Sequence, residues 1–312
     1  MRRKGLPIHG WLNLDKPVGP TSTQAIGRVR RITGAARIGH AGTLDPLASG
    51  VLPIALGEAT KTVPYIQDAQ KTYRFTVRWG QATNTDDAEG EVVSESAARP
   101  NLSDIEAVLP RFTGRILQTP PVYSAIKIGG QRSYALARAG EAAELEARPV
   151  EIHSLRLIER TDADHAVFEM ETGKGAYVRA LARDMGVALE TFGHVVALRR
   201  LAVGQFRAEK AYPLDFDALP SDIAGLTEQI LPIETALDDI PALALTADEA
   251  HRLRCGQAVG LFTHQHRDWL AELIAEGRDH GIVLALWRGK AVAMVRIDSA
   301  EAHPVRVFNY EP

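Results

Sequence analysis

Residues 73–79 read Tyr-Arg-Phe-Thr-Val-Arg-Trp, so large apolar side chains alternate strictly with polar ones. This alternation predicts a half-buried strand with Tyr73, Phe75, Val77 and Trp79 on its core face. Such a strand requires neighbouring strands and a core on one side. Further strands are expected at 11–14, around 92–93, at 151–159 and at 166–172. Helices are also expected. One spans 22–32 and follows a capping box at Thr21–Gln24, another begins at a capping box at Ser103–Glu106, and a third spans 177–191.

The length and composition indicate an ordinary globular chain. At 312 residues, and with about 150 residues per domain as a guide, two domains or one large one are expected. The 45% of hydrophobic and 24% of charged residues exclude disorder. No apolar run approaches the roughly 18 residues of a membrane span, and no apolar stretch follows the basic start as in a secretory signal. A single cysteine, Cys255, excludes an internal disulfide and a multi-cysteine metal site. We therefore expect a soluble, cytoplasmic protein.

The charge is unevenly distributed along the chain. Residues 1–80 carry 12 Lys and Arg against 4 Asp and Glu, although the whole chain has a net charge of −3. This basic quarter indicates either a polyanion-binding face or a solvated charged surface. Residues 211–250 carry nine acids and no Lys or Arg, which is typical of a connector. We expect a boundary near residue 240, with one domain at 1–240 and a compact second one at 241–312.

The segment from Arg37 to Gly50 concentrates glycines and small residues around Asp45-Pro46. Glycines at 39, 42 and 50 permit positive φ angles or a close approach of the backbone to a ligand. A carboxylate between Leu44 and Pro46 can serve as a nucleophile or base. The same pair of residues also suits a simple Asp-Pro turn. The segment is not a phosphate-binding P-loop, because no Gly-Lys-Ser/Thr follows.

This segment, Gly39-His40-Ala41-Gly42-Thr43-Leu44-Asp45-Pro46, resembles the catalytic signature of the TruB family of bacterial tRNA pseudouridine synthases, whose loop carries one essential aspartate. Further blocks follow in the family's order over residues 10 to about 205: 10–17, 56–61, 71–73, 173–179 and 198–201. Ala41 departs from the threonine of many relatives. The resemblance implies an α+β pseudouridine synthase fold, with a central mixed, mostly antiparallel sheet flanked by helices. It also implies a small β-rich, PUA-like RNA-binding domain at the C-terminus.

The resemblance implies three catalytic residues. Asp45 is expected to drive cleavage of the C1′–N1 bond of the target uridine. Arg179 is expected to pair with it, because a buried carboxylate needs a cationic partner to stay ionised. Tyr73 is expected to stack on the uracil and help remove the C5 proton. Without the resemblance, Arg179 reads as a surface arginine and Tyr73 as a core aromatic.

The resemblance also implies RNA-binding residues. Arg199 and Arg200 are expected to contact phosphates, and His40 to lie against flipped nucleotides. The insertion at 118–148 lacks a core pattern and corresponds to a surface thumb that closes on the RNA, although a passive surface loop is the alternative. The full set of expected RNA-binding residues is Lys16, His40, Lys127, Arg132, Tyr177, Leu198, Arg199 and Arg200.

The implied activity is conversion of uridine 55 in the T arm of tRNA into pseudouridine. No cofactor and no metal are expected, because isomerisation at a glycosidic bond needs no redox chemistry, and His264-Gln265-His266 lacks a third ligand. The expected partner is the T-arm stem–loop of tRNA, bound by a monomer without an obligate protein partner. Two alternatives remain: a guide-dependent pseudouridine synthase that shares the aspartate loop, and a tRNA-folding chaperone in which catalysis is secondary.

Overall fold

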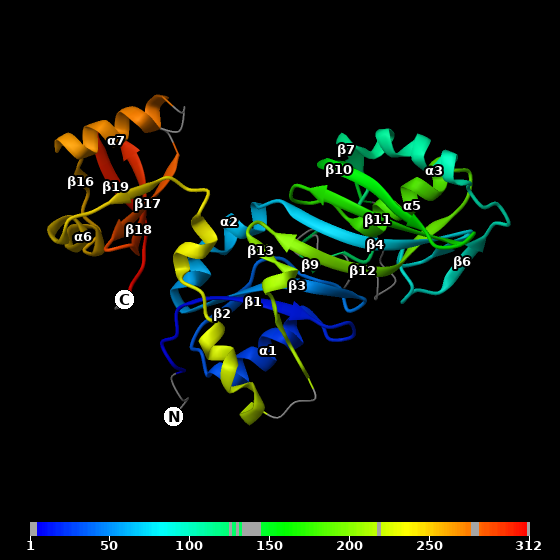
Figure 1. The fold of residues 1–312 in the computed structure, drawn as a ribbon, viewed down its shortest axis with the longest axis horizontal. Helices are drawn as coiled ribbons and strands as arrows, with labels where there is room; N and C mark the ends of the chain where they lie inside the picture. Colours follow the sequence, from blue (N-terminus) through cyan, green and yellow to red (C-terminus); the bar gives the residue numbers. More distant parts are fainter. Residues whose placement is uncertain are drawn as a thin grey trace.

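A computed structural model describes residues 5–124, 127–128, 131–132, 145–216, 220–275 and 281–310. Most strands belong to one large mixed sheet, and a smaller sheet follows in the C-terminal part of the chain (Figure 1). The helices are α1 (Ser22–Thr33), α2 (Val63–Asp68), α3 (Leu102–Val108), α5 (Val178–Ala188), α6 (Ala247–Arg254) and α7 (His264–Ala275). Short 3₁₀ helices are η1 (Gly57–Thr62), η2 (Leu109–Phe112), η3 (Ala208–Lys210), η4 (Pro220–Gln229) and η5 (Ile233–Leu237).

The large sheet has ten strands and confirms the predicted mixed, mostly antiparallel α+β architecture. Only the pairs β1–β14 and β3–β12 are parallel. Across the sheet the strands are β14 (Tyr212–Pro213), β1 (Gly10–Lys16), β3 (Ala48–Leu56), β12 (Gly193–Val203), β4 (Lys71–Trp79), β11 (His165–Thr172), β10 (Arg148–Arg160) and β7 (Gly114–Gln118), with β2 (Ile38–His40) on β3 and β13 (Phe206–Arg207) on β12. The neighbours β3, β12 and β4 therefore bring together residues far apart in the sequence.

The alternation along the central strands places apolar side chains on both faces of the sheet. Phe75, Val77 and Trp79 of β4 pack with residues of α1 and α5 in one cluster, as the sequence pattern predicts. Trp11 of β1, one residue from Leu12 of that cluster, points to the opposite face and packs in a second cluster. The first cluster thus covers one face of the large sheet, and the second covers the opposite face around β1 and β3, whereas Arg74 of β4 stays exposed on that face.

Several local predictions are confirmed and one helix start is wrong. The capping box at Thr21 and Gln24 opens α1 as predicted. The second helix is capped by Asn101 with Asp104, two residues before the predicted Ser103, because Asn101 is extended and its side chain accepts the Asp104 N–H. The predicted strand near residue 92 is β6 (Val92–Glu95), which pairs with β5 (Gln81–Thr83) outside the large sheet.

The C-terminal sheet has five strands in the order β15 (Ala242–Ala244), β17 (Ile282–Trp287), β18 (Lys290–Asp298), β19 (Glu301–Val307) and β16 (Val259–Gly260). Helices α6 and α7 accompany it (Figure 1). This sheet packs on the large one, since Met294 and Phe308 share a buried cluster with Trp11 and Phe206. Two glutamates also join the parts: Glu58 accepts the Asn309 N–H at 2.6 Å, and Glu234 accepts the Ala291 N–H.

The acidic stretch 211–250, predicted to be a connector, packs against the large sheet along part of its length. Its apolar residues Leu214, Leu226, Ile233, Ala236 and Leu237 are buried in the two clusters that cover the large sheet. The stretch therefore contributes apolar side chains to the core as well as connecting the two sheets.

The start of the predicted thumb also differs from expectation. Gln118, Pro120, Pro121 and Ser124 are buried, whereas Thr119 and Val122 are exposed, so residues 118–124 lie only partly on the surface. A short hairpin of β8 (Lys127–Ile128) and β9 (Gln131–Arg132) follows, and the predicted helix at 134–139 lies outside the described residues.

None of the helices in the described part of the chain has the length and apolar content that a bilayer crossing requires.

Candidate active site

Asp45 lies in the loop between β2 and β3, and this loop is fixed from two directions. The Ser22 hydroxyl at the start of α1 accepts the Leu44 N–H at 2.9 Å and donates to the Leu44 carbonyl at 3.0 Å. Gly42 has a φ of 109°, which favours glycine. Leu44 is buried as an apolar anchor, whereas the Asp45 side chain keeps 40% of its surface exposed. The loop therefore presents one carboxylate from a rigid support.

Arg200 of β12 holds the same loop from behind. Its guanidinium donates to the carbonyls of Val51 at 2.7 Å, Gly42 at 3.1 Å and Thr43 at 3.4 Å. The residue is 1% exposed. Its donors are directed at backbone carbonyls inside the protein, and the expected phosphate contact of Arg200 stays a prediction. In the structure Arg200 supports the backbone that carries Asp45.

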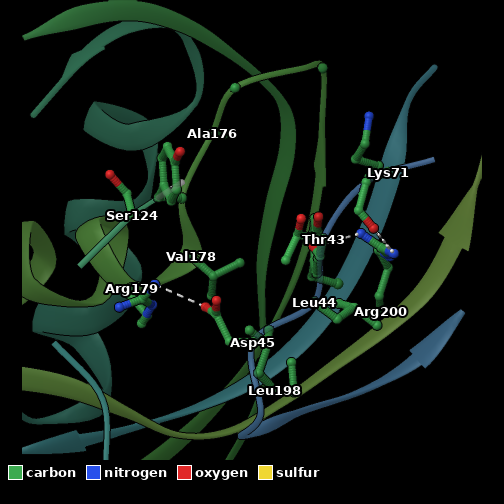
Figure 2. A pocket seen from close by; sticks show the side chains of 16 residues that line it. Thr43, Leu44, Asp45, Lys71, Ser124, Ala176, Val178, Arg179, Leu198 and Arg200 are labelled. Carbon is green, nitrogen blue, oxygen red and sulfur yellow. Dashed lines mark hydrogen bonds and ion pairs between the residues drawn. The ribbon is translucent and has the colours of Figure 1, made fainter. Parts of the chain in front are cut away.

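Arg179, in the first turn of α5, pairs with Asp45 as predicted. Its Nη2 lies 2.9 Å from Asp45 Oδ2, and its side chain is only 7% exposed (Figure 2). The same guanidinium donates to the carbonyls of Thr85 at 2.9 Å and Tyr123 at 2.8 Å. Charge-assisted bonds of this kind are the strong ones in proteins, so they fix the direction of the Asp45 carboxylate.

A second carboxylate, Asp87, was missed by the sequence reasoning. Its Oδ2 lies 3.4 Å from Arg179 Nη1, and its side chain is 4% exposed. Asp87 also accepts the Thr85 hydroxyl at 2.6 Å and the Glu89 N–H at 3.1 Å. Arg179 therefore lies between a buried carboxylate and the exposed Asp45. The only signal in the sequence is the acidic pair Asp86-Asp87, which reads equally well as an ordinary turn.

These side chains surround one cavity of about 290 Å³ (Figure 2). The site residues predicted from the sequence that line it are Asp45, Tyr73, Tyr177, Arg179, Leu198 and Arg200. Burial raises the pKa of the Tyr177 phenol, so that ring stays protonated at neutral pH. The cavity combines one half-exposed carboxylate, its arginine and two tyrosines. No cluster of three or more His, Cys, Asp or Glu residues suited to a metal occurs in the described ranges.

Comparison with known proteins agrees with this geometry. Residues 30–178 match the model of the TruB family pseudouridylate synthase N-terminal domain, and residues 179–238 match that of the tRNA pseudouridylate synthase B C-terminal domain. The chain is 54% identical over 309 residues to "tRNA pseudouridine synthase B" of Rhodospirillum rubrum, covering 99% of both chains. It is 52% identical over 318 residues to the protein of the same name from Bradyrhizobium diazoefficiens, covering 99% of this chain and 88% of that one.

This chain belongs to the TruB family. Its fold is also that of two solved structures. The first, "Crystal Structure of a Cbf5-Nop10-Gar1 Complex", has a TM-score of 0.70 and 22% identity, covering 96% of this chain and 85% of that one. The second, "Structure of H/ACA RNP bound to a substrate RNA containing 2'-deoxyuridine", has a TM-score of 0.71 and 19% identity, covering 99% of this chain and 91% of that one. These two likenesses concern the fold alone.

Two expected RNA-binding residues of this TruB-family chain lie apart from the cavity surface. Lys16 is fully buried, and its ammonium donates to the carbonyls of Pro17 and Pro20 at 2.8 Å each. Burial lowers the pKa of Lys16 to about 8, although the negative charge of Asp45 raises it in part. The RNA contact expected of Lys16 stays a prediction, and its ammonium is already bonded inside the protein. Arg199 points to the opposite face of β12 from Arg200 and pairs with Asp15 at 2.7 Å.

The remaining RNA-binding predictions stay untested. His40 ends β2 immediately before the Asp45 loop but is not among the residues that line the cavity. Lys127 and Arg132 pair through their backbones in the β8–β9 hairpin. Lys71 was not predicted, although it lines the cavity beside Tyr73. Its ammonium donates to the carbonyls of Gln67 and Ala69 at the end of α2, and burial lowers its pKa to about 8.

Proposed function

We propose that this protein converts uridine 55 in the T arm of tRNAs into pseudouridine. The observation that carries the proposal is the Asp45–Arg179 pair, 2.9 Å apart at the wall of a cavity, in a chain of the TruB family. Relatives about half identical to this chain over nearly its whole length are named tRNA pseudouridine synthase B, which supports tRNA as the substrate.

The reaction is an isomerisation that the cavity can support without an added group. The C1′–N1 bond of the target uridine breaks, the uracil turns, and a C1′–C5 bond forms. The proton that C5 loses is balanced by the proton that N1 gains. Asp45 supplies the carboxylate that drives cleavage of the glycosidic bond, and Arg179 fixes its direction. No electrons are exchanged with an outside acceptor in this sequence.

The rest of the cavity wall suits an extruded base. A uridine stacked in RNA must be flipped out before reaction, at a cost of a few kcal/mol. Tyr73 and Tyr177 provide aromatic rings, and Leu198 provides an apolar surface at the same cavity. Base–aromatic stacking compensates for the lost stacking in the RNA. We assign Tyr73 to stacking on the uracil and to removal of the C5 proton.

We further propose that residues 241–312 form a PUA-like domain that binds tRNA away from the T arm. Arg252, Arg288 and Lys290 are exposed in this part of the molecule. The guanidinium groups of Arg254 and Arg288 lie over the Trp287 ring, at 5.4 Å and 4.8 Å from its centroid. Arginines grouped in this way suit phosphate contacts, which position RNA without reading its sequence. We place the protein in the cytoplasm, where it acts without a protein partner.

The test is nucleoside analysis of an unmodified tRNA transcript after incubation with the purified protein alone. Appearance of about one pseudouridine per tRNA supports the proposal. A requirement for an added guide RNA would indicate a guide-dependent synthase. Refolding of misfolded tRNA without any pseudouridine would indicate a chaperone and overturn the proposed function. The assay is run at one fixed salt concentration, because phosphate contacts make RNA affinity strongly salt-dependent.

A further inference from the structure

Residues 173–177, which join β11 to α5 and lead to Arg179 in the cavity wall, have few bonds among themselves. Six of the sixteen residues that line the cavity come from this stretch and the first turn of α5: Gly173, Gly175, Ala176, Tyr177, Val178 and Arg179. Gly175 has a φ of 88°, and a Cβ atom added to it would have no neighbouring atom within 4 Å. Tyr177 is the N-cap of α5, and its side chain makes no capping bond. Something outside the stretch must therefore fix its direction.

That external support is the side chain of Gln118, at the end of β7. Its Oε1 accepts the Tyr177 N–H at 2.8 Å, and its Nε2 donates to the Tyr177 carbonyl at 3.1 Å. The same carbonyl accepts the Leu181 N–H that begins α5. Gln118 is 1% exposed, so water does not compete for these bonds. One carboxamide thus satisfies both backbone groups of the residue at which the helix begins.

Two further bonds join the same segments. Arg179 donates to the Tyr123 carbonyl, and Arg183 donates to the Thr119 carbonyl at 2.7 Å. Both arginines, however, also bind the 85–87 loop, since Arg183 pairs with Asp86 at 3.0 Å. Gln118 alone among these side chains is bonded only to the backbone at the start of α5. It is therefore the residue whose replacement shifts the start of α5 without removing a charge from the site.

We propose that Gln118 is a positioning residue for the reaction, which acts by holding the Tyr177 backbone so that the Arg179 guanidinium meets Asp45. This inference rests on the proposed function. A displacement of about 1 Å at a reacting group costs on the order of 100-fold in rate, whereas RNA affinity depends on contacts spread over a larger surface. Gln118 therefore contributes to the rate of isomerisation and little to RNA affinity.

The test compares Gln118→Met with wild type in single-turnover reactions on a T-arm hairpin, with Kd measured in parallel. Methionine keeps the length and removes both bonds. We expect the rate at saturating RNA to fall about 10- to 100-fold while Kd changes less than about threefold. Gln81→Met is the matched control, because the Gln81 amide bonds only the exposed Glu95; its rate stays at the wild-type value.

Two readouts separate positioning from general destabilisation. Hydrogen exchange of the first turn of α5 rises in Gln118→Met, while exchange in the β17–β18 hairpin stays unchanged. In an Arg179→Lys background the same substitution lowers the rate by less than about threefold, because its effect passes through Arg179. Unchanged exchange, or equal rate losses in both backgrounds, would overturn the inference. A wild type that forms no pseudouridine overturns the proposed function, whereas an active wild type with an unaffected Gln118→Met rate overturns only this inference.

Discussion

The two sheets of the molecule bury different kinds of side chain. Around the large sheet several charged groups are buried: Lys71, Arg179 and Arg200 line the cavity, and Asp87 pairs with Arg179. In the described residues of the C-terminal sheet and its helices, His266 is the one buried polar side chain, and the core is aliphatic. Burying charge costs free energy unless partners compensate, so such groups accumulate where chemistry requires them. The comparison is consistent with catalysis at the large sheet, and RNA binding by the small sheet is a separate proposal.

Arg179→Ala is expected to cause the largest combined loss of reaction rate and stability. This substitution removes the partner of Asp45 and leaves Asp87 buried without its guanidinium. We expect the single-turnover rate at saturating RNA to fall by at least about 100-fold, and the free energy of unfolding to drop by about 3–5 kcal/mol. Rates and urea unfolding curves check both. A loss of affinity with an unchanged rate would show that Arg179 is a phosphate contact.

Leu253→Ala tests the aliphatic core of the small sheet in the same way. Leu253 of α6 is fully buried among apolar side chains. We expect a loss of about 2–5 kcal/mol in the free energy of unfolding, with the rate on a T-arm hairpin unchanged at a temperature where the variant is folded. A fall in that rate without a loss of stability would place the small sheet in the chemistry and break the comparison.

Charge reversal on the small sheet tests its contact with RNA. Arg252→Glu combined with Arg288→Glu reverses two exposed charges. A thermal melt accompanies the assay, because Arg252 also donates to the Ala258 carbonyl and Arg288 lies over the Trp287 ring. We expect affinity for full-length tRNA to fall about tenfold at moderate salt, while affinity for the isolated hairpin stays within about twofold. Deleting residues 241–312 is less informative, because it would uncover Trp11 and Phe206. Equal losses on both RNAs would contradict a contact outside the T arm.

The smallest expected effect concerns buried Lys16. Its pKa is about 8 in the folded protein against 10.5 for an unperturbed lysine. Between these pH values the unfolded chain binds more protons, so this group makes the free energy of unfolding rise with pH, by up to about 1.4 kcal/mol per pH unit. Urea unfolding at pH 8 and pH 9.5 checks this rise. Lys71, whose pKa burial also lowers to about 8, contributes a rise of its own, so Lys16→Met should reduce the rise without abolishing it, and the exposed-site control Lys174→Met should keep it. Parallel behaviour of wild type and Lys16→Met would contradict the burial of a titrating lysine.

The sequence correctly predicted a strand and a helix start that depend on interactions between neighbouring residues. The alternation in β4 and the capping box of α1 depend on neighbouring residues, and both are confirmed. Asp45 and Arg179 followed from the family resemblance, and the structure brings them together. Asp87 and Gln118 were missed because their partners lie 92 and 59 residues away in sequence and meet them only in the folded chain. The support that Arg200 gives to the Asp45 loop was also missed, because it depends on carbonyls about 150 residues away in sequence.

The central claim is that the Asp45 carboxylate performs the isomerisation of one uridine in tRNA. The most direct measurement is a nucleotide-resolution pseudouridine map of a tRNA transcript after reaction with wild type and with Asp45→Asn, with Kd determined for both proteins. Asparagine keeps the shape and removes the charge. The account predicts pseudouridine at uridine 55 with wild type, none with Asp45→Asn, and RNA affinities within about threefold of each other. Substantial pseudouridine formation by Asp45→Asn, or modification by wild type only at other uridines, would contradict it.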